Sequence, residues 1–516
     1  MKRALLSLIA VSVAAKLLVI WSGLCERGVI ADDAYYFFTI AKNIGDGFGP
    51  TFDRISPTNG FHPLWQFAIV PLFSTTSDLW IPIRAALTLS LVFDVISGII
   101  IVDLARRVGR PDRAGLIAAA LWFLFPITAF LGLRGMESSL STVLVLLSLR
   151  LTLTAVDQQF SWRSAFPCGI AFALSGLART DNLPCVGLAI LMVVMVATRP
   201  ESRRRGCYWL LVTGATAVLL VAPWLLWNLD RFGSIVQVSG LIKLHTRYLF
   251  GALPDWGTTP EAGIRALAHR VFAPVLVPVR FLLGEEFKST ALTPVITFLA
   301  IAVYALPVCL QAGRFVRDRK ALPVFVFAMT WMIAHVALYG FVWGSYASWY
   351  SLTFMALLTF VTAASLSGTE QPHRRRANVF SLVSAGGVAI AIYAALFGHM
   401  SRKHKTPEEL LGRKLSAIRA GAPDAVIGAF NAGAVGYVGT HHGLRVVNLD
   451  GLVNNKVYEA LQSGRYLEYV QETVDVMFET PQRAAVFLGP QQLQELHRAY
   501  STYADGLWYR SNYQQR

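Results

Sequence analysis

Charged residues are scarce in this 516-residue chain: Asp, Glu, Lys and Arg together make up 15%, against roughly 25% in soluble globular proteins. Hydrophobic residues make up 54%. This composition excludes a disordered chain, a fibrous protein and an ordinary soluble enzyme. It favours one large membrane domain with a smaller soluble part.

Acidic residues are also fewer than basic ones, 31 against 46, which gives a net charge of +15. In a soluble protein such an excess would suggest nucleic acid as a partner. In a membrane protein it is typical of cytoplasmic loops. We therefore expect no nucleic-acid partner.

Cysteine is nearly absent, with five residues and no CxxC motif. Most of them lie in apolar runs, which is typical of small core residues. A disulfide framework and a cysteine-based metal site are both excluded.

Long apolar runs fill the first 398 residues. The run from Ala4 to about Leu24 follows Lys2 and Arg3. Its length and the lack of a small-residue cleavage site favour a first transmembrane helix, with its N-terminus inside, over a cleaved signal peptide. Ten further spans of about the length needed to cross a membrane are expected at residues 83–105, 112–131, 139–156, 163–178, 183–198, 207–227, 291–311, 321–342, 347–366 and 378–398.

Basic clusters at residues 106–113, 199–205, 314–320 and 374–376 then fall on one side, which the positive-inside rule makes cytoplasmic. The predicted fold is an all-α polytopic membrane domain of about 11 helices over residues 1–398, with outer loops 25–82 and 228–290. Pro63–Phe73 covers only half a span, so we expect an interfacial or re-entrant helix.

The tail over residues 399–516 is polar and is expected to lie outside the cytoplasm. Short β-like runs at residues 425–430, 445–448 and 484–488 alternate with Gly-rich turns and helical stretches. This pattern predicts a small α/β domain.

Polar residues collect in the predicted outer loops, where the chemistry of a polytopic protein is expected. Asp32 and Asp33 open the first loop. Either one of them caps a helix over residues 34–44, or a carboxylate serves in chemistry. Asn59, His62 and Trp65 follow as candidate substrate contacts.

Two shorter outer loops each carry an arginine and an acid. Arg134 and Glu137 lie in one, and Arg179 and Asp181 lie in the other. Both pairs are open to two interpretations, a local ion pair or side chains that line a site. For Arg179 and Asp181 we favour the ion pair.

The long outer loop carries Lys243, His245 and Arg247. In an extended segment this alternating spacing would turn all three to one side. Cations at an outer membrane edge suit a lipid phosphate. The alternative is binding to the head groups of membrane lipids.

The order of the motifs ADDAYY, GDGFG, HPLW, GMESS and ARTDN resembles the GT-C superfamily of membrane glycosyltransferases, which use polyprenyl-phosphate sugars. The nearest likeness is to bacterial relatives of the mycobacterial terminal arabinofuranosyltransferase. It covers most of the membrane domain and extends into the tail through AGAVGY and RVVNLDGLVNN.

The resemblance implies a multi-pass protein of the bacterial plasma membrane that moves a sugar, arabinofuranose or mannose, from a polyprenyl phosphate to an extracytoplasmic glycan, lipid or protein. It implies Asp32 or Asp33 as base or metal-site residue, with Glu137 assisting. A divalent metal (Mg, Mn or Ca) would bind Asp33 and Glu137. Lys243, with His245 and Arg247, would bind the donor phosphate, and Arg179 and Asp181 would contact substrate, although relatives often have Arg-Pro-Asp-Gly at this point.

Two other classes of protein remain open. A transporter or lipid flippase would need charges inside the membrane, and Asp94 in the second span is the candidate. An Asp there is more often paired with a neighbouring helix. A scaffold that binds glycans through its tail is the second alternative, and the clustering of polar residues in outer loops favours the enzyme over both.

Overall fold

The computed structural model describes residues 2–109, 111–246, 259–283, 309, 311–313, 315–367, 405–478, 481–500, 502–504 and 507–511. Contacts divide the chain into two units. Unit 1 comprises residues 1–22, 87–223 and 250–399, and unit 2 comprises residues 23–86, 224–249 and 400–516. Unit 2 thus gathers the predicted first outer loop, the start of the long outer loop and the tail.

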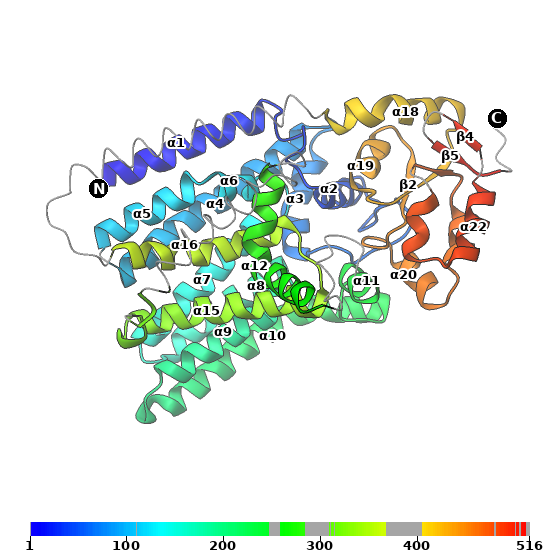
Figure 1. Ribbon diagram of the computed structural model, residues 1–516. Coiled ribbons are helices and arrows are strands. Elements are labelled where there is room, and N and C mark those ends of the chain that lie inside the picture. The colour runs from blue at the N-terminus through cyan, green and yellow to red at the C-terminus, as the bar shows by residue number, and fades with distance from the viewer. Residues whose placement is uncertain are drawn as a thin grey trace. The chain divides into compact units, whose positions relative to one another are not determined.

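The regular elements in the described part of unit 1 are helices (Figure 1). Its helices are α1 (Lys2–Trp21), α4 (Ile81–Val108), α5 (Pro111–Phe123), α6 (Pro126–Gly132), α7 (Ser138–Asp157), α8 (Ala165–Ala178), α9 (Asn182–Ala197), α10 (Arg203–Phe232), α12 (Pro260–Leu283), α15 (Ala321–Ala337) and α16 (Ser351–Ser367), with a π-helical turn, η3, at Leu338–Trp343. The first residues of α4 and the last of α10 belong to unit 2.

Within the described residues, six helical stretches are long and apolar enough to cross a membrane: Lys2–Trp21, Ile81–Val108, Ser138–Asp157, Pro200–Phe232, Ala321–Trp343 and Ser348–Ser367. Each contains or closely matches a predicted span. A seventh is possible if α5 and α6, bent by 57° just before Pro126, count as one span. Proline favours such a break, because it disfavours helical backbone in the residue before it.

The remaining predicted spans correspond to shorter helices or lie outside the described residues. Helices α8 and α9 have 14 and 16 residues. The spans expected at 291–311 and 378–398 fall almost wholly outside the described residues. The count of about 11 helices and the placement of loops inside or outside the cell therefore stay predictions.

A buried ion pair joins α1 to α4 inside unit 1. Lys16 Nζ lies 2.7 Å from Asp94 Oδ2, and the two side chains are 2% and 3% exposed. Ser139 Oγ donates a hydrogen bond to the other oxygen of Asp94. The expectation that Asp94 is paired with a neighbouring helix is confirmed, and the candidate charge for a transport path is thereby accounted for.

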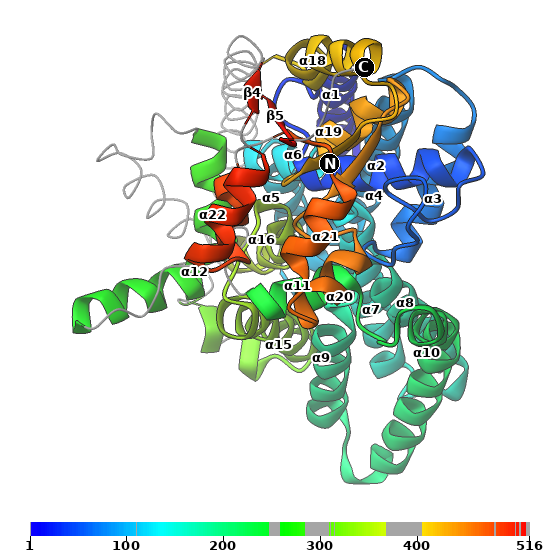
Figure 2. The same cartoon turned by 90° about the vertical axis from the view of Figure 1, so that its right-hand side faces the viewer.

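Unit 2 combines helices from three parts of the chain with a small sheet. The helices are α2 (Asp32–Gly45), α3 (Pro63–Ser74), α11 (Val238–Thr246), α18 (Pro407–Gly421), α19 (Gly433–His441), α20 (Asn455–Gln462), α21 (Tyr466–Thr473) and α22 (Pro490–Ala499). Figure 2 shows α20, α21 and α22 grouped beside one another. The tail as a domain of its own stays a prediction, because unit 2 also contains residues 23–86 and 224–249.

The sheet of unit 2 has the strand order β2-β1-β3-β5-β4. Its strands are β1 (Val426–Ala429), β2 (Arg445–Asn448), β3 (Val476–Met477), β4 (Thr502–Ala504) and β5 (Leu507–Tyr509). β1 pairs in parallel with β2 and β3, whereas β5 is antiparallel to both β3 and β4. Apolar residues of β1, β2 and β3 join those of α20 and α21 in one core cluster.

Two of the three β-like runs predicted from the sequence are strands. The third prediction, at residues 484–488, is wrong: Pro481–Val486 forms a 3-10 helix, and the third parallel strand is the two-residue β3. A short apolar run suits a buried helical turn as well as a strand, so periodicity alone does not separate them. The expected long loop over residues 228–290 likewise contains two helices, α11 and α12.

Candidate functional site

The acidic pair of the first loop lies in the first turn of α2. Asp32 and Asp33 are the first two residues of the helix, and Ala31 occupies the N-cap position without a side-chain cap. The hypothesis that one of the two acids caps this helix is therefore wrong. Their charges are favourable at a helix N-terminus, and adjacent helical positions turn the side chains about 100° apart.

Asp32 instead binds the start of another helix. Its Oδ2 accepts a hydrogen bond from the N–H of Gly433, and its Oδ1 accepts one from the N–H of Ala434, both at 3.0 Å. These are the first residues of α19, and α2 and α19 pack together (Figure 1). Position 433 requires glycine, because a Cβ there would lie 2.0 Å from the backbone oxygen of Asp32.

A second acid, which the sequence analysis missed, lies buried beside α2. Asp450 has no exposed surface. It accepts hydrogen bonds from Tyr36 Oη at 3.2 Å, from Asn431 N at 3.0 Å and from Leu452 N at 3.0 Å. An acid two residues after the end of a predicted parallel strand, followed by glycine, is the signal that could have indicated it.

Tyr36 connects this acid with the first turn of α2. Its hydroxyl donates to Asp450 and accepts a hydrogen bond from Asn448 Nδ2 at 3.2 Å. Tyr36 lies one turn along the helix from Asp32 and Asp33. The tail is thus hydrogen-bonded to α2 at its first residue and again one turn later.

Burial changes the proton affinity of these acids. Burial is the main cause that raises the pKa of Asp32 to about 7. The charges of Asp33 and Asp450 also raise this pKa, whereas the two backbone hydrogen bonds lower it. Burial also raises the pKa of Asp450 to about 6. Within the described part of the chain, neither acid forms an ion pair with Lys, Arg or His. Carboxylates with pKa values near neutrality are effective proton acceptors at physiological pH.

Asn59 holds three parts of unit 2 together. It is fully buried, and its Nδ2 donates to Asn228 Oδ1 at the end of α10. Its Oδ1 accepts from Val238 N in α11 and from Asn455 Nδ2 in α20. This is the geometry of a structural residue.

The other two candidate contacts of the first loop flank the start of α3. Trp65 is fully buried, whereas His62 is half-buried at the N-cap position of α3. Substrate binding by Asn59, His62 and Trp65 stays a prediction.

The predicted donor-phosphate segment is helical, so the expectation of an extended segment with all cations on one side is wrong. Lys243 and His245 both lie on α11, and residues two apart on a helix point about 200° apart. His245 Nδ1 lies 3.4 Å from Gln462 Nε2 of α20. Arg247 lies outside the described residues.

In unit 1, Arg179 binds two acids at once. Its Nε lies 3.0 Å from Asp181 Oδ1, so the predicted local ion pair is confirmed. Its Nη1 also binds Glu137, and all three side chains are buried. Tyr339 Oη accepts from Arg179 and donates to Asp181. The assisting role of Glu137 in catalysis and substrate contacts by Arg179 and Asp181 stay predictions.

Among the residues that the structure describes, no three His, Cys, Asp or Glu side chains are grouped so that they could hold a metal ion. A divalent cation with oxygen ligands usually needs several such groups or bound water. The residues expected to bind a metal, Asp33 and Glu137, lie in different units. Metal binding by Asp33 and Glu137 stays a prediction.

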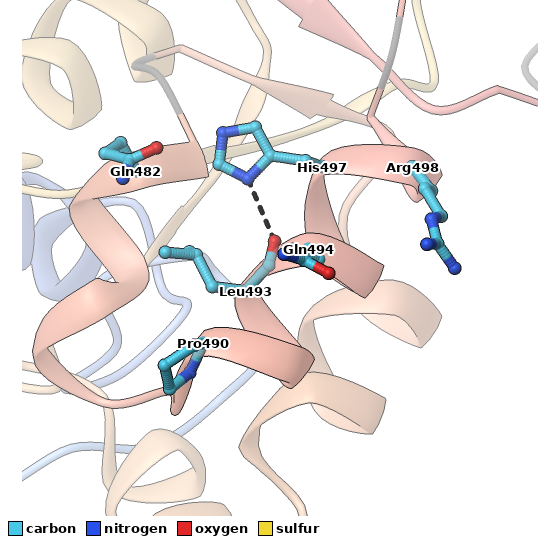
Figure 3. Close-up of a pocket in the computed structure, with 6 residues that line it drawn as sticks. All are labelled: Gln482, Pro490, Leu493, Gln494, His497 and Arg498. Atoms are coloured by element: carbon cyan, nitrogen blue, oxygen red, sulfur yellow. Dashed lines mark hydrogen bonds between the residues drawn. The ribbon is translucent and has the colours of Figure 1, made fainter.

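An open hollow lies on α22 and the 3-10 helix before it, with a volume of about 460 Å³ (Figure 3). The ring of His497 is fixed by a 2.9 Å hydrogen bond between its Nδ1 and the carbonyl oxygen of Leu493. Amide, imidazole and guanidinium groups of this kind suit the hydroxyls of a sugar. The lining residues are Gln482, Pro490, Leu493, Gln494, His497 and Arg498.

Comparison with known proteins connects this architecture with sugar transfer. A family model described as dolichyl-phosphate-mannose-protein mannosyltransferase matches residues 67–227. No curated protein sequence matches the chain.

Solved structures match over almost the whole chain. The archaeal oligosaccharyltransferase AglB from Archaeoglobus fulgidus, in complex with an inhibitory peptide and a dolichol-phosphate, is 14% identical with a TM-score of 0.59, covering 96% of this chain and 72% of its own. ArnT from Cupriavidus metallidurans, bound to undecaprenyl phosphate, is 13% identical with a TM-score of 0.60, covering 93% and 95%. These structures share the fold of this chain, and the family model links residues 67–227 with mannosyl transfer.

Proposed function

We propose that this protein is a membrane glycosyltransferase that moves a sugar from a polyprenyl phosphate to a hydroxyl group of an acceptor, with an acid of the first turn of α2 as the base. The observation that carries the proposal is the acidic N-terminus of α2, where Asp32 and Asp33 are adjacent. The likeness in fold to AglB and ArnT supports it.

The chemistry requires a base and a good leaving group. The acceptor hydroxyl attacks the anomeric carbon, a new C–O bond forms, and the bond between that carbon and the phosphate oxygen breaks. The hydroxyl proton passes to the carboxylate, and the electron pair leaves with the polyprenyl phosphate. A base positioned in this way typically contributes 10²–10⁴-fold to the rate.

The contrast between the acids of the two units favours the pair on α2. Glu137 and Asp181 are bound to the guanidinium of Arg179, which stabilises the ionised carboxylate and makes it a weaker base. Asp32 has backbone N–H partners and no basic side-chain partner in the described part of the chain. Any contribution of Glu137 would then be electrostatic.

The donor and the acceptor are proposed by class. The neighbouring structures contain dolichol-phosphate, undecaprenyl phosphate and a peptide, which supports a polyprenyl-phosphate donor here. Mannose is named in the matching family description, and arabinofuranose remains the second candidate from the sequence resemblance. Lys243 or His245 on α11 would stabilise the phosphate as it leaves.

The acceptor would be an extracytoplasmic glycan, lipid or protein at the plasma membrane of a bacterium. The hollow on α22 is a candidate contact for a glycan acceptor, because its polar side chains suit sugar hydroxyls. A tail that only binds glycans would also explain this hollow, but it would not need the acidic turn of α2.

The test is transfer by the purified protein in nanodiscs. Radiolabelled mannosyl and arabinofuranosyl polyprenyl phosphates are supplied in parallel with an octyl glycoside acceptor, and labelled product is separated by chromatography. We expect product from one donor, and loss of at least 100-fold in at least one of Asp32→Asn and Asp33→Asn. Asp424→Asn, at an exposed acid of unit 2, is the matched control and should keep full activity. The proposal is overturned if no labelled product forms with either donor.

A further inference from the structure

Helix α3 has its polar and apolar sides reversed. Gln66, the polar residue in the middle of the helix, is fully buried, and its Nε2 donates a hydrogen bond to the carbonyl oxygen of Phe37 in α2 at 3.1 Å. Phe67, on the other side of α3, is 55% exposed. A helix that faces water normally has its polar side chains outside, so the outer side of α3 does not have the composition of a water-facing surface.

The apolar character of this segment extends beyond one side chain. Four exposed or half-buried residues follow the spacing of one helix face; they are Leu64, Phe67, Ala68 and Pro71. Residues 55–77 contain no Asp, Glu, Lys or Arg. The next charge, Asp78, accepts a hydrogen bond from the N–H of Ile81, where α4 begins, and α4 is long and apolar enough to cross a membrane. The uncharged segment around α3 thus leads directly into a candidate span.

A row of aromatic rings joins α3 to the end of α10 within unit 2. The ring centroid of Phe61, just before α3, lies 6.3 Å from that of Phe67 and 5.5 Å from that of Trp224. Trp224 stacks on Trp227 at 5.0 Å, and Trp227 lies 5.3 Å from Phe232. Tryptophan is enriched where transmembrane helices leave the lipid. Because α10 is part of a stretch that is apolar enough to cross a membrane, this row has the composition of a belt at a membrane interface.

The end of α10 indicates the level of this row. Asp230 and Arg231 follow the tryptophans, and their side chains are exposed, as charged groups beside a membrane are expected to be. Trp224 lies six residues before Asp230, which corresponds to at most about 9 Å of depth along the helix axis. A helix that lies in a membrane interface has its apolar face about 5–10 Å deep. Phe67, which reaches Trp224 through Phe61, is at a level that suits such a helix.

The other end of α3 lies beside charged groups. A Cβ at Gly45, the last residue of α2, would lie 2.9 Å from Oγ of Ser74, the last residue of α3. Lys42 and Asp46 form an ion pair of 3.2 Å at this same end of α2. If α3 entered the membrane steeply, these charges would be drawn toward the lipid, which is costly. The contact therefore favours a helix that lies along the membrane surface over a re-entrant one.

We propose that α3 anchors unit 2 to the lipid bilayer, with its outer face of Leu64, Phe67, Ala68 and Pro71 among the acyl chains at the surface where α10 ends. The partner is the hydrocarbon border of the membrane, because this face is apolar, uncharged and continuous with the aromatic end of a candidate span. Since α3 packs on α2, the anchor also holds the helix with the acidic turn at this surface. The value of that position for sugar transfer rests on the proposed function, whereas the anchor itself does not.

The experiment measures the depth of single nitroxide labels on the full-length protein in phosphatidylcholine nanodiscs. Power-saturation EPR compares the access of oxygen, which concentrates in lipid, with that of a nickel chelate, which stays in water. The exposed Cys207 and Cys309 are first replaced by serine. Labels are then attached, one at a time, to Phe67→Cys and Pro71→Cys on the outer face of α3.

Two exposed apolar residues elsewhere serve as matched controls. Val486→Cys, in the 3-10 helix of unit 2, is the control for water, and Leu219→Cys, in the middle of α10, is the control for lipid. We expect the labels on α3 to favour oxygen over the chelate, at a depth of about 5–10 Å. The label on Val486→Cys should be open to the chelate, and that on Leu219→Cys should lie deeper than both labels on α3.

Three results would overturn the proposal. The label on Phe67→Cys could be as open to the chelate as the water control, as deep as the lipid control, or shielded from both reagents. These results mean, in turn, a helix in water, a re-entrant helix, and a face covered by protein such as a second copy of the chain. Should Phe67→Cys fail to fold, Pro71→Cys decides on the same terms. The measurement needs no sugar transfer, so a failure of the proposed function leaves its outcome unaffected.

Discussion

The acids around α2 in unit 2 are held differently from the buried acids of unit 1. In unit 1, Asp94 is paired with Lys16, and Glu137 and Asp181 share Arg179. In unit 2, Asp32 and Asp450 are held by backbone N–H groups and by a tyrosine hydroxyl.

The difference lies in the kind of partner that each acid has, a cation or a neutral donor. A buried charge without a partner is costly, and the acids Asp94, Glu137 and Asp181 of unit 1 each have a cation beside them. For Asp32 and Asp450, which have no cation beside them in the described residues, burial raises the pKa of Asp32 to about 7 and that of Asp450 to about 6, although the amide hydrogen bonds act in the opposite direction. Unit 2 also contains acids that are paired with cations, such as Glu26 with Arg84 and Asp53 with Arg445, so the contrast is specific to the acids around α2.

Removing Arg179 should have the largest effect. Arg179→Met leaves Glu137 and Asp181 as buried acids without their shared cation, and breaking one buried pair costs about 3–5 kcal/mol. We expect little folded protein, measured by monodisperse yield after detergent extraction. Arg163→Met, at an exposed arginine of the same unit, is the control. Equal yields of the two variants would contradict the view that Arg179 neutralises this cluster.

Breaking the pair between α1 and α4 should destabilise unit 1 somewhat less, because only one acid loses its partner. Lys16→Met leaves Asp94 buried at 3% exposure, and we expect a free-energy cost of about 3 kcal/mol. The double variant Lys16→Met/Asp94→Leu should recover most of it, since two apolar side chains replace the pair. Thermal unfolding in detergent measures this, with the exposed Lys2→Met as reference. A double variant less stable than Lys16→Met would refute the pairing argument.

The acids of unit 2 predict a pH dependence of the opposite sign to that of an ion pair. Burial raises the pKa of folded Asp450 from 3.8 to about 6, so the folded state binds a proton that the unfolded state has already released. Asp450 should therefore add to the stability of the folded state as the pH falls from about 7 to about 4. Asp32 contributes with the same sign.

Hydrogen exchange of the amides of Asn431 and Leu452, corrected for intrinsic rates, should slow over this range. The charged or titratable groups near Asp450 are Tyr36, Asp32 and Asp33 on α2 and Tyr466 on α21. In Asp450→Asn we expect the pH dependence to be reduced. If the variant behaves like the unchanged protein, Asp450 is not the titrating group.

The smallest effects are expected for the cations of α11. Lys243 and His245 point away from each other on the helix, so one of Lys243→Ala and His245→Ala should lower kcat/KM for the lipid-linked donor more than about fivefold, near 1 kcal/mol. The other should remain within twofold. If neither falls by fivefold, this helix does not bind the donor phosphate.

Features that depend on local pattern were predictable from the order of residues. These features depend on residues that are close together in the sequence or on a regular pattern of apolar residues. They are the apolar runs around α1, α4, α7, α10, α15 and α16, the strands β1 and β2, and the ion pair between Arg179 and Asp181. The acidic pair was also recognisable, because two adjacent acids after a long apolar run are unusual. Prediction failed for short segments such as α11 and residues 481–486, where helix and strand patterns cannot be distinguished.

Only the tertiary structure decided what the acids do. Asp32 meets α19 across about 400 residues, Tyr36 meets Asp450 across 414, and Glu137 meets Arg179 across 42. A local pattern tells which residues prefer burial, but it does not tell which distant backbone donor will replace the water that a carboxylate loses. Which partner an acid meets depends on which segments fold against each other. The partner in turn decides whether the acid is paired with a cation or has a pKa near neutral pH.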